Sequence, residues 1–226
     1  MERARSLPEL SRDDLGERLG RYLVGDLPAE AFSALHVHYR ELARWSPRLA
    51  LIGPGTVDEV LERHFGESLA ALPLIPEEPP PGGGEIVDLG SGAGFPGLVL
   101  AAARPRWRVT LVEARQRKWA FLTTVARKAA LSVRCLDVRV ALPLPAELPR
   151  EIDLLTARAV RLPAEVDAAL FDRLRPDGRA LRWAGAADPE VPAGFSAGAV
   201  VPLAGSERRR IVEYRADPPS STQPPP

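Results

Sequence analysis

The stretch Asp88-Leu89-Gly90-Ser91-Gly92-Ala93-Gly94-Phe95-Pro96-Gly97 decides the fold of this chain. A short apolar run ends just before it, and a second, residues 98–103, follows it. This order predicts a β-strand, a tight turn and an α-helix. Glycines are needed where the backbone takes a positive φ or comes closer to a ligand than a Cβ would permit, and the free N–H groups of the following helix then face that ligand. We therefore expect a nucleotide-like ligand at this turn.

Two acidic residues narrow the choice of ligand. Glu113 ends the next predicted strand roughly 20 residues after the glycines, the interval at which an acid accepts hydrogen bonds from ribose hydroxyls. Sites for nicotinamide dinucleotides share that feature. Asp88, two residues before the first glycine, disfavours a pyrophosphate anion but suits the ammonium group of S-adenosylmethionine. The pair favours S-adenosylmethionine, with a nicotinamide or flavin dinucleotide as the alternative.

The composition is that of an ordinary soluble globular protein. The chain has 226 residues, 45% of them hydrophobic and 27% charged, which suits one α/β domain with an appendage. No apolar run approaches the roughly 18 residues of a membrane span, and the first residues lack the pattern of a secretory signal. The single cysteine, Cys135, excludes an internal disulfide and fits a reducing compartment. We expect a cytoplasmic protein that binds no membrane.

The formal net charge is zero, but the charges are unevenly distributed. Residues 1–85 contain 9 basic and 15 acidic residues, whereas Arg104–Lys128 contains 8 basic residues and one acid. This asymmetry predicts a face that meets a polyanion, with a solvated helix face as the alternative. All cations except Lys118 and Lys128 are arginines. Because such enrichment can reflect a biased genome, arginine abundance alone is weak evidence for nucleic-acid binding.

The first 80 residues predict a helical extension. Apolar residues recur at helical spacing in three segments, 12–24, 28–45 and one that begins at Thr56 and runs to Leu72. Thr56 and Glu59 read as the N-cap and N3 residues of a capping box. Residues 73–84, rich in proline and glycine, are expected to form a linker.

From residue 85 to 215 the pattern alternates between strands and helices, which predicts a parallel sheet. The expected strands are 85–89, 108–112, 132–136, 152–157 and 179–183, with a closing hairpin of 197–203 and 209–215, and the expected helices are 96–103, 116–130 and 163–174. We predict an α/β, Rossmann-like class I S-adenosylmethionine-dependent methyltransferase fold with a seven-stranded, mostly parallel sheet. Residues 216–226, dominated by proline and serine, are expected to be a disordered tail.

The sequence offers few candidates for a general base that would activate the atom to be methylated. The motif of amino methyltransferases is absent after the fourth strand, where Thr156-Ala157-Arg158-Ala159-Val160 stands instead. Methylation of cytosine C5 would need a cysteine nucleophile, but the single cysteine, Cys135, is expected in a structural position. His36, His38 and His64 lack metal-ligand spacing, so no metal site is expected. These absences suit guanine N7, whose lone pair needs positioning rather than deprotonation.

Several motifs together resemble the RsmG/GidB family, bacterial enzymes that methylate guanine N7 in small-subunit ribosomal RNA. The matching stretches are the glycine turn with its Phe95-Pro96-Gly97, the segment Leu111–Leu122, Thr156-Ala157-Arg158-Ala159-Val160, and Arg63-His64-Phe65-Gly66-Glu67-Ser68-Leu69, in which Glu67 replaces the family's aspartate. Phe-Pro-Gly is the most specific of these because methyltransferases in general do not share it. The resemblance covers roughly residues 30–214 and implies a small-subunit rRNA or 30S partner for a monomeric enzyme.

Site residues follow from the motifs and the resemblance. The expected cofactor-binding residues are Asp88, Gly90, Ser91, Gly92, Ala93, Gly94, Phe95, Glu113 and Arg139. The resemblance places Lys118, Arg139 and Arg158 near the cofactor and the RNA, as catalytic residues. The alternatives are an exposed helix charge for Lys118, a structural role for Arg139, and an ion pair with Asp88 or Glu113 for Arg158.

Two departures from the family pattern leave other functions open. Arg48-Leu49-Ala50 stands where the family often has Asn-Leu-Thr, and Trp183-Ala184-Gly185 stands near its usual Lys-Gly, with Arg182 as a displaced cation. The alternatives are therefore a methyltransferase fold that binds cofactor or RNA without catalysis, and a methyltransferase of small molecules or proteins.

Overall fold

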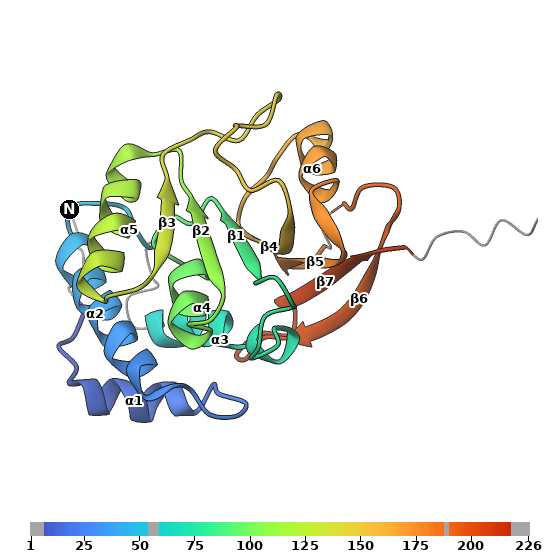
Figure 1. The fold of residues 1–226 in the computed structure, drawn as a ribbon. Coiled ribbons are helices and arrows are strands. Elements are labelled where there is room, and N and C mark those ends of the chain that lie inside the picture. The colour runs from blue at the N-terminus through green and yellow to red at the C-terminus, as the bar shows by residue number, and fades with distance from the viewer. Residues whose placement is uncertain (1–6, 54–58, 188–189, 218–226) are drawn as a thin grey trace, which may run out of the picture.

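The computed structural model of the chain describes residues 7–53, 59–187 and 190–217. In these residues seven strands form one sheet in the order β3-β2-β1-β4-β5-β7-β6 (Figure 1). The strands are β1 (Glu85–Leu89), β2 (Arg108–Val112), β3 (Val133–Leu136), β4 (Ile152–Arg158), β5 (Leu174–Ala184), β6 (Phe195–Pro202) and β7 (Arg210–Ala216). Strands β1 to β5 pair in parallel, and β7 pairs antiparallel with β5 and β6. The predicted seven-stranded, mostly parallel sheet is confirmed.

The strand order reverses at β1, which places the glycine turn at the switch point of the sheet. Strand β1 pairs with β2 on one side and with β4 on the other. In an open α/β sheet, ligands bind beyond the carboxyl ends of the strands at such a point. The turn follows β1 directly, so its residues lie at the carboxyl edge of the sheet between the ends of β2 and β4.

Helices cover both faces of the sheet. Helices α4 (Gly97–Ala103) and α5 (Gln116–Lys128) pack with the amino-terminal helices in one hydrophobic cluster, and α6 (Ala164–Phe171) belongs to a second (Figure 1). Strand β1 supplies Ile86 to the first cluster and Val87 to the second. Successive strand residues point to opposite faces, and parallel strands covered on both faces are apolar throughout.

The strand expected at 179–183 begins earlier, because β5 starts at Leu174 and contains Arg175-Pro176-Asp177-Gly178, which read as a turn before that strand. The pairing of β4 with β5 is irregular in this part, with a register shift between Ile152 and Leu154. A bulge-like irregularity admits proline and glycine into a strand. The predicted helix 163–174 accordingly ends earlier, at Phe171.

The helical extension begins with α1 (Arg12–Gly20) and α2 (Ala29–Trp45). The sequence predicts a first helix that reaches Val24; instead it ends at Gly20, and Gly25 follows with a φ of 89°. Among the described residues, no helix has the length and apolar content to cross a membrane.

The third helical segment is not the single helix that the sequence predicts. It comprises a π-helix (Leu61–Gly66), a short α3 (Glu67–Leu69) and a 3₁₀ turn (Leu72–Leu74). Proline at position 73 cannot donate an intrahelical hydrogen bond, which explains why an α-helix does not continue. A Cβ at Gly66 would lie 2.8 Å from the Tyr22 ring, so the segment packs closely on the end of α1. The predicted N-cap, Thr56, lies outside the described residues.

The predicted linker 73–84 packs against the sheet. Ile75 is buried, and the indole Nε1 of Trp107 donates to the carbonyl of Pro76 at 3.0 Å. Arg104 donates to the carbonyls of Ile75 and Leu72. The extension and the sheet share one hydrophobic cluster, so the extension is part of the wall around the glycine turn.

Candidate functional site

Among Gly90, Gly92 and Gly94, Gly92 has the most space around its Cα. Gly90, Gly92 and Gly94 all have positive φ, at 62°, 56° and 86°. A Cβ at Gly90 would lie 2.4 Å from Val160, whereas at Gly92 the nearest atoms would be the Gly90 carbonyl at 3.6 Å and Lys118 Nζ at 3.9 Å. Gly90 is therefore needed for packing, and Gly92 leaves backbone accessible to a ligand.

Glu113 closes the turn onto the end of β2. Its Oε2 accepts a hydrogen bond from the backbone N–H of Gly92 at 2.9 Å, and its Oε1 accepts one from Arg115 N–H at 2.8 Å. The residue is 7% exposed. A carboxylate has about four lone-pair sites, and these two bonds leave capacity for ligand hydroxyls.

Asp88 acts inside the protein rather than at its surface. The side chain is fully buried, and its oxygens accept from Thr156 Oγ1 at 2.8 Å and from the backbone N–H of Gly97 at 3.2 Å. Burial raises its pKa to about 6, against the opposing effects of Thr156, Ser91, Gly97 and Arg158. Asp88 thus ties the turn to β4 and to the start of α4, and its contact with a cofactor stays a prediction.

The remaining turn residues are enclosed. Ser91 is buried, and its Oγ donates to the carbonyl of Asp88 at 2.9 Å. Ala93 and Phe95 are also buried, and Pro96 is the N-cap of α4. Of the predicted turn residues, Gly90 and Gly92 are therefore the accessible ones.

Lys118 and Arg139, two of the three predicted cations, have different settings at this edge. Lys118, half-buried on α5, stands beside Gly92 and Glu113. Burial lowers the pKa of Lys118, and Glu113 opposes that effect. Arg139 follows β3, is exposed, and has no hydrogen bond or ion pair with a described residue. The structure brings Lys118 to the turn but leaves Arg139 in solvent.

Arg158, at the end of β4, pairs with a residue of the extension. Its Nη2 lies 2.8 Å from Oε2 of Glu67 and also contacts the carbonyl of Arg63. The alternative of an ion pair with Asp88 or Glu113 is wrong in this respect, because the partner is Glu67.

Glu67 joins three parts of the chain. Besides Arg158 it pairs with Arg209 at 2.6 Å, and its carbonyl accepts the indole N–H of Trp183 at 3.0 Å. Burial raises the pKa of Glu67, and the arginines oppose this effect. Glu67, which replaces the family's aspartate, therefore anchors the extension to the ends of β4 and β5.

Two histidines are the site residues that the sequence does not reveal. His38 and His64 stack on Phe95 with ring centroids 4.7 Å and 5.1 Å away and interplanar angles of 27° and 24°. His38 Nε2 lies 2.7 Å from the carbonyl oxygen of Ala93. Ala31, Leu35, His38 and Leu42 share one buried face of α2, so helical spacing predicts the burial of His38 but not its contact.

A cavity of about 1010 Å³ lies beyond the ends of β4 and β5. Its lining includes Ala157, Val160 and Asp167. Val160 also touches Gly90, so the cavity adjoins the glycine turn. Arg182 lies on its wall, buried, paired with Asp167 and over the ring of Phe171. It is therefore a paired structural residue and not a free displaced cation.

The basic segment 104–128 does not form one cationic face. Arg106 pairs with Glu78, Arg108 with Glu85, and Lys128 with Glu41, which corrects the sequence prediction. Exposed arginines without an ion pair to any described residue instead follow the carboxyl ends of β2, β3 and β4, namely Arg115, Arg117, Arg139 and Arg161. Asp137, close to Arg139 in the sequence, is an exposed acid.

Solved structures share this fold. A mutant of MtNAS in complex with S-adenosylmethionine matches with a TM-score of 0.56 and 16% identity, over 91% of this chain and 78% of that one. A SAM-dependent methyltransferase from Aquifex aeolicus gives 0.54 and 17%, over 73% and 94% of the two chains. At such identities the likeness concerns the fold, and the predicted Rossmann-like class I fold is confirmed.

Curated relatives carry the name ribosomal RNA small subunit methyltransferase G. The Desulfotalea psychrophila protein is 39% identical over 130 residues, and the Methylobacterium nodulans protein 44% over 109. These matches span 57% and 49% of those relatives, about half their length. The Hyphomonas neptunium protein is 37% identical over 159 residues, 70% of this chain and 71% of that protein. A family model described as rRNA small subunit methyltransferase G matches residues 32–190, and the chain therefore belongs to the GidB family.

Proposed function

We propose that the protein uses S-adenosylmethionine to methylate N7 of a guanine in small-subunit ribosomal RNA, guanine 527 in rRNA numbering. The observation that carries the proposal is the glycine turn, whose open Gly92 lies between Glu113 and Lys118. Membership of the GidB family supports the choice of RNA as substrate.

The residues present fit S-adenosylmethionine. Gly92 offers accessible backbone, and Glu113 retains lone pairs for ribose hydroxyls. The bound cofactor supplies an electrophilic methyl group on its sulfonium. The buried Asp88 holds the turn in place through its hydrogen bonds to Thr156 and Gly97, and Lys118 adds a cation beside Gly92.

Catalysis at guanine N7 asks the protein to orient a base, not to deprotonate it. The nitrogen lone pair is already available, so the protein's contribution is alignment with the methyl group. An A-form major groove hides N7, and the guanine must therefore lie unstacked or in a loop. The cavity beside Val160, next to the turn, provides room for such a base.

The exposed arginines at the carboxyl edge are the proposed RNA contacts. Arg115, Arg117, Arg139 and Arg161 follow the carboxyl ends of β2, β3 and β4 and are exposed. Phosphate contacts of this kind release counterions and make affinity depend on salt. The partner is small-subunit rRNA or the 30S subunit, in the cytoplasm, and the protein acts as a monomer.

The test is methylation of small-subunit RNA or 30S subunits from a strain that lacks the enzyme. The RNA is incubated with the protein and labelled S-adenosylmethionine, and 7-methylguanosine is mapped by chemical cleavage. We expect incorporation at one guanine. Intact cofactor binding without incorporation would contradict the proposed activity.

A binding protein without catalysis is the second candidate, and Trp183 favours it. This residue stands near the family's lysine and is committed to a hydrogen bond with the carbonyl of Glu67. Complementation separates the two candidates: restored rRNA methylation in the deletion strain eliminates the second.

A further inference from the structure

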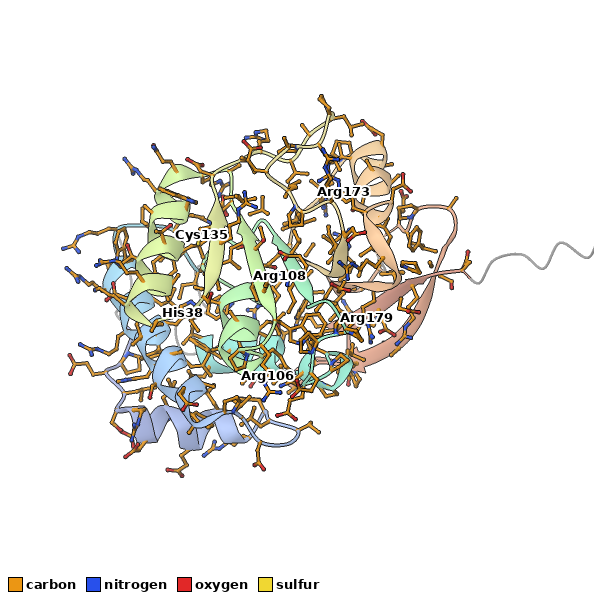
Figure 2. All side chains as sticks on the ribbon, in the orientation of Figure 1. His38, Arg106, Arg108, Cys135, Arg173 and Arg179 are labelled. Atoms are coloured by element: carbon orange, nitrogen blue, oxygen red, sulfur yellow. The ribbon has the colours of Figure 1, made fainter. Side chains whose placement is uncertain are left out.

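His38 connects the helical extension to the centre of the glycine turn. It lies on α2, 55 residues before Ala93, and Figure 2 labels it at the boundary between that helix and the sheet. The side chain is 1% exposed. Its ring stacks on Phe95, and its Nε2 lies 2.7 Å from the carbonyl oxygen of Ala93. One side chain thus contacts two residues of the turn.

The hydrogen bond fixes the protonation of the ring. A carbonyl oxygen only accepts, so Nε2 carries the proton and donates it. Nδ1 is buried and has no hydrogen-bond partner among the described residues. Burial lowers the pKa of His38 to about 4, which keeps the imidazole neutral near pH 7. His38 therefore behaves as a fixed donor.

The accepting carbonyl belongs to the residue next to the accessible Gly92. Ala93 stands between Gly92, the accessible position, and Gly94. Gly92 is held from the opposite side by Glu113. Gly92 and Ala93 are consequently held by Glu113, at the end of β2, and by His38, from the extension, and release of either side chain leaves a buried polar group without its partner.

We infer that His38 is a positioning residue, which holds the glycine turn in its ligand-binding form by donating to the carbonyl of Ala93. The inference rests on the proposed function, in that the ligand of the turn is S-adenosylmethionine. It assigns the extension a direct role in cofactor affinity, through a residue outside the family's matched motifs.

Two amide substitutions test the hydrogen bond. In H38Q the side-chain nitrogen reaches about the place of Nε2, whereas in H38N it stops near Nδ1. The matched control is H36N, since His36 lies on the same helix and its Nε2 contacts the carbonyl of Leu10 at 2.9 Å, away from the turn. Affinity for S-adenosylmethionine is measured by calorimetry at a temperature where circular dichroism shows all proteins folded.

We expect H38N to weaken the affinity for S-adenosylmethionine about ten-fold, because it leaves the buried carbonyl of Ala93 unpaired. H38Q and H36N should stay within about two-fold of wild type. In methylation assays H38N should raise the KM for the cofactor more than it lowers kcat at saturation. Equal affinities of H38N and wild type would overturn the role of His38, as would an H38Q as weak as H38N. A wild-type protein that binds no S-adenosylmethionine would instead refute the proposed function.

Discussion

The two edges of the parallel sheet use the same residue types for different purposes. At the amino edge, Arg108 pairs with Glu85, and Asp153 accepts the backbone N–H of Glu85. At the carboxyl edge, Glu113 and Lys118 surround an accessible glycine, and Arg115 is exposed without an ion pair to a described residue. Arg108 at the amino edge is neutralised by a nearby acid, whereas Arg115 at the carboxyl edge remains available; at that same edge Arg158 is neutralised by Glu67. The comparison teaches that the partner of a charge, rather than its place in a basic segment, indicates its role.

The largest effect is expected where the carboxyl edge is closed by the extension. Glu67→Ala leaves Arg158 and Arg209 without their shared carboxylate in a buried setting. We expect the free energy of unfolding to fall by roughly 3–5 kcal/mol, measured by urea denaturation. Glu78→Ala at the amino edge, which breaks an exposed pair with Arg106, is the control and should leave the free energy of unfolding nearly unchanged, because solvent screens that pair. Equal losses in the two variants would contradict the proposed difference between the edges.

The carboxyl edge should also give stability a composite pH dependence. Burial lowers the pKa of His38 from 6.5 to about 4, so its contribution is present above pH 6.5 and is lost as pH falls toward 4. Burial lowers the pKa of His64 to about 3, which acts in the same direction. Asp88 acts oppositely: its pKa is raised from 3.8 to about 6, so its contribution is present below 3.8 and is lost as pH rises through 6.

Replacement of His38 separates these opposing contributions. Each of the His38 and Asp88 shifts corresponds to roughly 3 kcal/mol. In H38Q the position no longer titrates. The stability advantage of wild type over H38Q should therefore shrink by roughly 3 kcal/mol between pH 6.5 and pH 4. Parallel pH profiles from urea denaturation would show that His38 does not titrate as a buried group.

Affinity for S-adenosylmethionine should depend on Glu113 at the carboxyl edge and not on Glu85 at the amino edge. Glu113→Ala frees the N–H groups of Gly92 and Arg115 and removes the acceptor for ribose hydroxyls. We expect S-adenosylmethionine binding to weaken by roughly 1–3 kcal/mol in calorimetry. Glu85→Ala is the control, since Glu85 is similarly buried and accepts from Thr110 Oγ1 at 2.7 Å. Unchanged affinity in Glu113→Ala would refute its role.

The local features of this molecule could be predicted from the sequence. Strand β1, the turn and α4 follow from apolar runs and glycine spacing, and the position of Glu113 at the end of β2 follows from the same pattern. These signals lie within about one βαβ unit, where spacing along the chain determines spacing in the fold. The expected order of strand, turn and helix and the positive φ of the turn glycines are therefore both found.

The contacts between the extension and the sheet could not be predicted. Glu67 meets Arg158 across 91 positions of sequence, and Lys128 meets Glu41 across 87. Neither pair leaves a local pattern, because its geometry depends on how helices pack on the sheet. The basic segment 104–128 was misleading for the same reason: the acids that neutralise it come from remote segments.

RNA binding offers the finest test of the two edges. R115A/R117A removes two exposed arginines at the carboxyl edge, and R106A/R108A removes two paired ones at the amino edge. Each lost phosphate contact reduces the slope of log affinity against log salt by about 0.7–0.9, so R115A/R117A should lower the slope by about 1.5. R106A/R108A should leave it unchanged, because those guanidiniums already face carboxylates. Fluorescence anisotropy with a small-subunit rRNA fragment at several salt concentrations measures both slopes. If the two double variants lowered the slope equally, the RNA surface would extend to the amino edge, and ion pairing would not distinguish the cations that bind it.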